Sequence, residues 1–201
     1  MLDYYTNQLN MQYTLPKELL YHIMLELNIN EIKNLCFTNY GFFDICDDIH
    51  FWKQKFDQDG LVYVDLPDLN IFKLYEAAYK STKIMYLIDN KILLDTEKTP
   101  KYISFTLKGK DFTKIIGYFH SEIFSKKLNI RINFRQGQII ITTRIKTKNM
   151  NADVTEHINE QKLYYILTKL FYYYPNKHIF DKYSNNLHSP KIYNFLMNGP
   201  E

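Results

Sequence analysis

The first regular element that the sequence predicts is a helix over residues 15–27. Its apolar residues recur three or four positions apart, as on one face of a helix. They are Leu15, Leu19, Leu20, Ile23, Met24 and Leu27. Thr14 can cap this helix, and Pro16 stands in its first turn, where the missing N–H costs little.

Three shorter apolar stripes follow between residues 30 and 56. Asn30 can cap a second helix, Asn39 can cap a third, and a fourth short turn carries aromatic residues. The apolar members are Ile32, Leu35, Cys36, Phe42, Phe43, Ile45, Cys46, Phe51, Trp52 and Phe56. Helices this short are marginal alone, and about forty residues bury little surface. The rest of the chain or another protein must therefore cover this segment.

A further helix and a change of pattern come next. Asn70 can cap a helix that we expect to buttress the first module. Its shared apolar face consists of Ile71, Leu74, Tyr75, Ala78 and Tyr79. From Ile103 to Lys108 apolar and polar residues alternate as in a half-buried strand. A second domain is therefore expected to begin near residue 91.

Residues 111–145 predict a helix followed by a β-hairpin. Asp111 starts the helix, whose stripe is Phe112, Ile115, Ile116, Phe119 and Ile123. If Gln136 and Gly137 form a two-residue turn, one side of the hairpin pairs mostly apolar residues. These pairs are Phe134 with Ile139, Ile132 with Ile141, Ile130 with Thr143 and Leu128 with Ile145. On the other side only Ile140 departs from a polar pattern, which supports the register.

The chain is predicted to end with a long helix and a tail. Pro175 stops the helix, and its stripe is Leu163, Ile166, Leu167, Leu170, Phe171 and Tyr174. The tail, residues 191–201, is expected to add a short helix. The fold class is α+β, with a tail (1–13), a helical module (14–60), a bridging helix (61–90) and an α+β domain (91–201) that binds a target. That last domain is built from strand, helix, β-hairpin and long helix.

Composition and charge are those of a folded soluble protein. Hydrophobic residues make up 46% and charged residues 23% of the 201 residues, which supplies a core and a solvated surface. The net charge of +3 is too mild to indicate nucleic acid by itself. No secretory start and no run of about 18 apolar residues occurs. We therefore expect an intracellular protein, cytoplasmic or nuclear, with no membrane partner.

Sequence motifs for catalysis or metal binding are absent. There is no glycine-rich phosphate loop, no zinc-type Cys or His pair and no nucleophile motif. We expect no enzymatic activity, no cofactor and no metal. Cys36 and Cys46 lie among apolar helical residues, and we interpret them as reduced core thiols rather than a disulfide or metal pair.

A set of residues between Leu15 and Lys53 follows a known family pattern. The residues, in order, are Leu15, Pro16, Glu18, Leu19, Ile23, Leu27, Ile32, Leu35, Cys36, Phe51, Trp52 and Lys53. In identity and spacing they resemble an F-box, over about residues 14–56. The alternative is that these helices form the core of an ordinary α-rich domain. The Leu-Pro start, the Leu-Cys pair and the Phe-Trp end together favour the F-box, because a generic bundle requires none of them.

The resemblance implies a three-helix module that docks onto the Skp-family adaptor of a cullin-based ubiquitin ligase. The residues implied to face the adaptor or support that interface are Leu15, Pro16, Leu19, Leu20, Ile23, Leu27, Leu35 and Cys36, with Trp52 packing the end of the module. After Cys36 the family commonly has a basic residue and an aromatic, whereas this chain has Phe37, Thr38, Asn39 and Tyr40. That loop is similar to F-boxes encoded by large DNA viruses. With a residue usage typical of A+T-rich genomes, it favours a viral protein acting in a host cell.

The local charge feature is a stretch without acidic residues between Ile123 and Ala152. In the predicted hairpin register, its polar side carries Arg131, Arg135, Arg144, Lys146 and Lys148 as possible target-binding residues. Three interpretations of this side remain open. It is either a solvated sheet face, a surface for an acidic protein target, or a nucleic-acid site. Nucleic acid is disfavoured because stacking aromatics are lacking there. A second candidate surface is the cluster of Tyr164, Tyr165, Tyr172 and Tyr173.

The function expected from these features is that of a substrate-recognition adaptor. The F-box would dock onto the ligase, and the C-terminal domain would hold the target near the transfer machinery, raising its effective concentration. One alternative is an interaction protein whose F-box-like helices serve assembly without ubiquitin. It would be favoured if the apolar face of residues 15–36 were covered within the chain. A less favoured alternative is a nucleic-acid-binding protein that uses the basic hairpin.

Overall fold

The computed structural model of the chain describes residues 15–38, 42–89, 102–117, 127–135, 138–146 and 151–175. These residues form seven helices and one four-stranded antiparallel sheet, which confirms the α+β class. The chain divides into two units, Met1–Tyr63 and Val64–Glu201.

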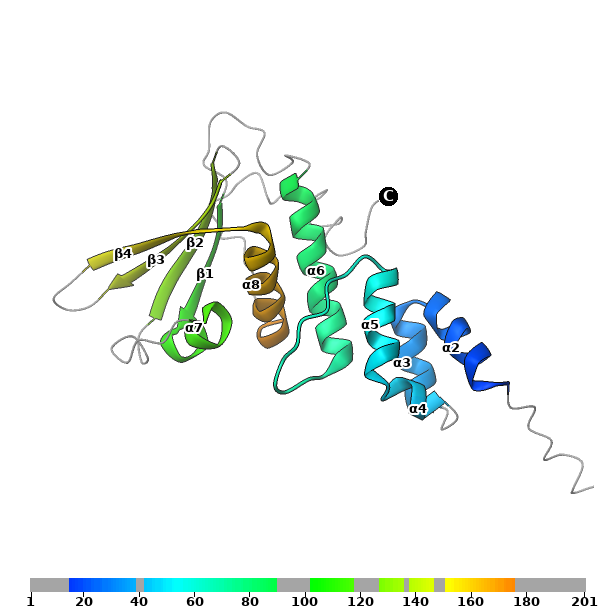
Figure 1. The fold of residues 1–201 in the computed structure, drawn as a ribbon. Coiled ribbons are helices and arrows are strands. Elements are labelled where there is room, and N and C mark those ends of the chain that lie inside the picture. Colours follow the sequence, from blue (N-terminus) through cyan, green and yellow to red (C-terminus); the bar gives the residue numbers. More distant parts are fainter. Residues whose placement is uncertain are drawn as a thin grey trace, which may run out of the picture. The chain divides into compact units, whose positions relative to one another are not determined.

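Four helices build the first unit: α2 (Lys17–Glu26), α3 (Ile29–Thr38), α4 (Phe43–Cys46) and α5 (Ile49–Gln58) (Figure 1). Their core consists of Met24, Leu25, Ile32, Ile45, Phe51, Trp52 and Phe56. The indole N–H of Trp52 donates a hydrogen bond of 2.7 Å to the carbonyl oxygen of Cys46, so the buried ring leaves no polar atom unsatisfied. The prediction of only a short turn around Trp52 was wrong, because α5 runs for 10 residues.

The caps of these helices differ in part from the prediction. The side chain that caps α3 belongs to Asn28, not to Asn30. The Oδ1 atom of Asn28 accepts from the backbone N–H groups of Asn30 at 3.0 Å and Glu31 at 3.1 Å. Glu31 in turn accepts from the backbone N–H of Asn28 at 2.8 Å. This reciprocal capping box fixes the start of α3 one turn from the end of α2.

Cys36 and Cys46 form a disulfide, which corrects the prediction of two reduced core thiols. Sequence reasoning placed each cysteine on a separate helix face and did not consider the distance between the two residues in the folded chain. Their Cα atoms lie 5.9 Å apart, well within the range that a disulfide spans. Both cysteines are half-buried, and the bond ties the end of α3 to α4.

The second unit contains three helices and the sheet. The helices are α6 (Ile71–Asp89), α7 (Gly109–Ile116) and α8 (Glu160–Tyr173), and the strands are β1 (Tyr102–Lys108), β2 (Lys127–Arg135), β3 (Gln138–Lys146) and β4 (Asn151–Ile158). The strands lie in the order β1-β2-β3-β4. Figure 1 shows α8 between the sheet and α6.

The helix α6 was predicted as a bridge that buttresses the first module, with the second domain starting near residue 91. In the structure α6 belongs to the second unit and packs along α8, and that unit begins at Val64 rather than near residue 91. The expected support of the first module by this helix stays a prediction. The Tyr172 hydroxyl accepts from the backbone N–H of Asn70 at 2.8 Å and donates to the carbonyl oxygen of Asp68. The predicted cap at Asn70 is confirmed, since its Oδ1 atom accepts from the N–H of Lys73 at 3.0 Å.

The predicted hairpin register is confirmed from Leu128 opposite Ile145 to Arg135 opposite Gln138. Sequence analysis missed β4, which pairs with β3 over residues 151–158. It also extended α7 too far. Gly117 ends that helix with a φ of 96°, in the left-handed region that glycine adopts without steric cost. Phe119, Ile123, the turn at residues 136–137 and the predicted helix in 191–201 lie outside the described residues.

The sheet has one covered face and one open face. The covered face is made of Ile103, Phe105, Leu107, Leu128, Ile130, Ile132, Phe134, Ile139, Ile141 and Thr143, all buried. Helix α8 contributes Leu163, Leu167 and Leu170, which are fully buried, and Lys162 of α8 pairs with Glu156 of β4 at 2.6 Å. Because side chains alternate along a strand, the intervening residues face solvent on the other side.

Candidate interaction surfaces

An exposed apolar stripe runs along one side of α2 in the first unit. Leu19 and Ile23 lie four residues apart on the same side of α2. Leu15 precedes the helix by two residues. The exposed fractions of Leu15, Leu19 and Ile23 are 47%, 51% and 47%. We call these three residues the α2 stripe. Completing their burial would be worth roughly 1 kcal/mol per side chain, because full burial of such a residue contributes about 1.5–3 kcal/mol.

The opposite side of α2 packs into the first unit. Met24 and Leu25 are buried, and the ring of Tyr21 meets that of Phe51 edge-on, with the centroids 5.2 Å apart. Lys55 of α5 reaches across to α2 and donates to the carbonyl oxygen of Leu25. These contacts hold α2 in place, so that its other side is presented as a rigid surface.

The remaining residues that the F-box resemblance implied divide into three groups. Pro16 is exposed beside the α2 stripe. Leu20, Leu27, Leu35 and Cys36 are half-buried, and the sulfur of Cys36 is engaged in the disulfide. Trp52 is 1% exposed, so it is a core residue and presents no surface to a partner. Phe43 was predicted only as an apolar helix residue, and Ile49 was not named in the sequence analysis. Both add exposed apolar surface to the same unit.

The open face of the sheet carries most of the predicted basic residues. Arg131 and Arg144 are exposed on it, and the register places Arg135 and Lys146 on the same face. Lys148 lies outside the described residues. The register adds two residues that the prediction left out, Lys108 of β1 and Lys127 of β2, which are partners in the strand pairing. We call this surface the basic sheet face.

One acidic residue, Asp153 of β4, shares the described part of the basic sheet face. Its two carboxylate oxygens accept from Nε and Nη2 of Arg144, both at 2.8 Å. These hydrogen bonds hold the pKa of the Asp153 carboxyl below its usual value. The neighbouring guanidinium of Arg131 lies over the ring of Tyr102, 4.3 Å from its centroid. Tyr102 therefore does not offer that side of its ring for stacking.

The predicted tyrosine surface is not a single surface. Tyr164 and Tyr172 are buried, Tyr173 is half-buried, and Tyr165 is exposed. Tyr172 acts structurally through its two hydrogen bonds to residues 68–70. The hydroxyl of Tyr164 donates to the carbonyl oxygen of Ala78 at 3.5 Å. The buried members of the cluster therefore fasten α8 to α6 and the segment before it.

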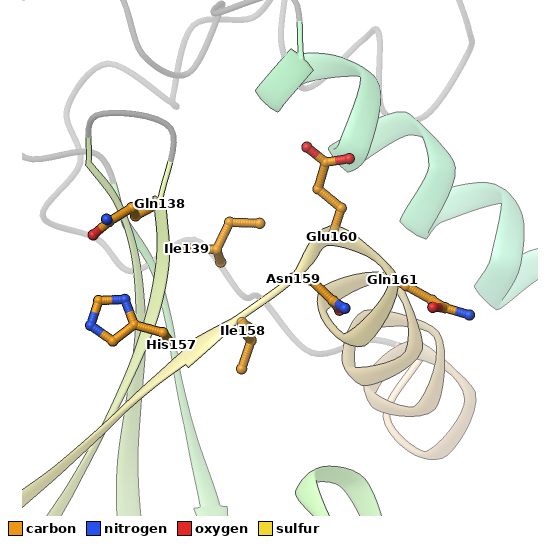
Figure 2. Close-up of a pocket in the computed structure, with 7 residues that line it drawn as sticks. All are labelled: Gln138, Ile139, His157, Ile158, Asn159, Glu160 and Gln161. Carbon is orange, nitrogen blue, oxygen red and sulfur yellow. The ribbon is translucent and has the colours of Figure 1, made fainter.

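A shallow pocket of about 480 Å³ opens where β3, β4 and α8 meet (Figure 2). Gln138 and His157 line it from the strands, and Glu160 and Gln161 line it from the first turn of α8. The side chain of Asn159 accepts from the backbone N–H of Lys162 at 2.8 Å and so caps α8. Figure 2 shows that the polar side chains point in different directions around Ile139 and Ile158. The pocket has no convergent set of groups for chemistry.

Within the described ranges there is no group of three or more His, Cys, Asp and Glu side chains that could hold a metal ion. None of the described helices is long and apolar enough to cross a membrane. No family model, no curated protein and no solved structure matches the chain significantly. The two surfaces described above are therefore the basis for a functional proposal.

Proposed function

We propose that the chain is a non-catalytic substrate-recognition adaptor. Its first unit docks onto the Skp-family adaptor of a cullin-based ubiquitin ligase, and its second unit holds a target protein. The observation that carries this proposal is the α2 stripe, in which Leu15, Leu19 and Ile23 remain about half exposed in the folded chain. Apolar side chains gathered on one side of a short helix are typical of a surface that a partner covers.

The position of the stripe supports the same proposal. The Leu-Pro start of the F-box resemblance lies at residues 15 and 16, and both residues are exposed. The side of α2 that carries Met24 and Leu25 is buried in the core of the unit. Full coverage of the apolar face of residues 15–36 within the chain would favour an assembly role without ubiquitin, whereas the α2 stripe remains about half exposed.

Binding of the full chain to a purified Skp-family adaptor tests this proposal. A double variant, Leu19→Asp with Ile23→Asp, should weaken binding by on the order of 100-fold, because it places two charges at the centre of an apolar interface. Val62→Asp is the matched control, since Val62 is an exposed apolar residue of the same unit, 56% exposed, that lies outside α2. It should bind as the wild type does.

Two results would overturn the proposal. The first is a folded wild-type chain that does not bind the adaptor. The second is equal loss of binding in the double variant and the Val62→Asp control. If the wild-type chain instead self-associates in sedimentation experiments and the double variant is monomeric, the α2 stripe serves assembly of copies of the chain.

A further inference from the structure

The basic sheet face gathers charge in a way that the sequence stretch alone does not reveal. Six basic residues and one acidic residue occupy its described register positions. The basic ones are Lys108, Lys127, Arg131, Arg135, Arg144 and Lys146. They come from three neighbouring strands, β1, β2 and β3, so they converge only when the sheet forms.

At one end of this face, three lysine positions are neighbours in the register of β1, β2 and β3. Lys108 and Lys127 are directly opposite each other in the β1–β2 register. Lys146 is the next residue of β3 after Ile145, which faces Leu128, so it continues the row on the third strand. Neighbouring strands lie about 4.8 Å apart, so the three lysine positions form a short row across the strands.

The internal neutralisation of the face is small. Asp153 is matched by Arg144 through two hydrogen bonds. The other acidic residue of β4, Glu156, lies on the covered side, opposite Ile141, and pairs with Lys162. Lys108 and Arg131 are exposed. The charges of these two residues are therefore open to solvent.

The other side chains of the face favour a polypeptide over a nucleic acid. They are mainly hydroxyl and amide groups, among them Ser104, Thr106, Asn129, Thr142 and Thr155. The hydroxyl of Thr106 donates to Oδ1 of Asn129 at 2.9 Å. Single-stranded nucleic acids bind sheet surfaces through aromatic rings on which bases stack. The described part of the face has one phenol ring, Tyr102, one side of which Arg131 covers, and one imidazole, that of His157 on β4. Side chains that donate and accept hydrogen bonds suit the backbone and carboxylates of an extended peptide.

We propose that the basic sheet face binds an acidic polypeptide segment, rich in Asp and Glu, in a protein partner. The face is chosen for its charge complementarity, with Lys and Arg on three strands meeting carboxylates on an extended chain. Only the further statement that this segment belongs to a ubiquitination target rests on the proposed function. Binding of the acidic segment itself is independent of it.

Fluorescence anisotropy with the full chain tests the proposal. The probe is a fluorescein-labelled peptide of ten glutamates, compared with a labelled single-stranded oligothymidylate of equal charge. Wild-type chain should bind the peptide more tightly than the oligothymidylate, and its affinity should fall as sodium chloride is raised through about 0.15 M. Lys108→Glu with Arg131→Glu should weaken peptide binding about tenfold or more, because two exposed attractions become repulsions.

The matched control is Lys33→Glu with Lys110→Glu. It changes the net charge equally at two exposed positions outside the face. This control should bind the peptide as the wild type does, and adaptor binding should be the same in both double variants. Failure of the peptide to bind, equal losses in the two variants, or tighter binding of the oligothymidylate would each overturn the proposal. Adaptor binding is measured separately, so failure of the proposed function is distinguishable from failure here.

Discussion

The side-chain nitrogen of Lys55 donates a hydrogen bond of 2.8 Å to the backbone carbonyl oxygen of Leu25. Lys55 is 3% exposed, and its nitrogen also pairs with the carboxylate of Asp59 at 2.9 Å. Leu25 lies in the last turn of α2, where carbonyl groups lack helical partners. A buried lysine of α5 thus completes the end of α2 and fixes the helix that carries the α2 stripe.

The first prediction follows from this contact. Lys55→Met keeps the aliphatic stem and removes the donor, so it should lower the free energy of unfolding of the first unit by about 1–3 kcal/mol. The chain has one tryptophan, and Trp52 lies in the core of that unit. Its fluorescence during urea unfolding therefore reports on the first unit. Lys33→Met, at an exposed position of α3, should change the free energy by less than about 0.5 kcal/mol. Equal effects of the two changes would contradict the structural role of Lys55.

The disulfide gives a second prediction. The bond joins residues 10 positions apart, and closing a loop of that size stabilises a protein by about 2–3 kcal/mol. Cys36→Ser with Cys46→Ser should lower the stability of the first unit by this amount in urea unfolding followed by Trp52 fluorescence. A reductant should lower the stability of the wild type to the same level and leave the double variant unchanged. If the reductant also lowered the stability of the double variant, its effect on the wild type could not be assigned to the Cys36–Cys46 bond.

This prediction bears on the proposed function. Reducing compartments keep thiols reduced, so the disulfide would not stabilise the first unit where ubiquitin ligases are expected to act. Covering the α2 stripe with a partner is then a second source of stability, because binding to the folded state stabilises it. Adaptor binding should therefore be measured with and without reductant.

The hairpin and β4 show what local pattern can and cannot predict. The register of β2 and β3 followed from alternation, because each one-residue shift would turn Ile130, Ile132 and Ile141 outward. The covered side of β4 includes a charged residue, Glu156, and Val154, which is 56% exposed. An edge strand packs on one neighbour only, so its sequence does not need the alternation that identifies a central strand.

For the two candidate surfaces, the sequence predicted many of the residues but not which of them are exposed or adjacent. Residues 15–27 are so rich in apolar side chains that periodicity marks a helix without separating the packed side from the exposed side. That separation depends on the packing of α2 against α5 and the rest of the unit, in which Met24 and Leu25 are buried and Leu19 remains exposed. Lys108 was missed for a comparable reason, because its place beside Lys127 requires the β1–β2 pairing. Both features depend on contacts between residues far apart in the sequence, which local sequence patterns do not reveal.

A third prediction concerns the link between α8 and the segment before α6. Tyr172→Phe removes the hydroxyl that bonds the N–H of Asn70 and the carbonyl oxygen of Asp68. Two backbone groups then lose a partner, which should lower the free energy of unfolding of the second unit by about 1–3 kcal/mol. Far-UV circular dichroism during urea unfolding measures this change. Tyr165→Phe, at an exposed position of α8, is the control, and an equal loss there would refute the assignment.

The last prediction concerns Thr168, a buried residue of α8. Its hydroxyl oxygen has no hydrogen-bond partner among the described residues, and the residue is fully buried. A buried polar group without a partner costs about 1–3 kcal/mol. Thr168→Val replaces the hydroxyl with a methyl group of similar size, so it should raise the free energy of unfolding of the second unit by about 1 kcal/mol. Thr168→Ala also removes a methyl group and leaves a small cavity, which offsets the gain or reverses it. Urea unfolding followed by far-UV circular dichroism compares the two variants, and a Val variant less stable than both the wild type and the Ala variant would mean that the hydroxyl is satisfied in solution.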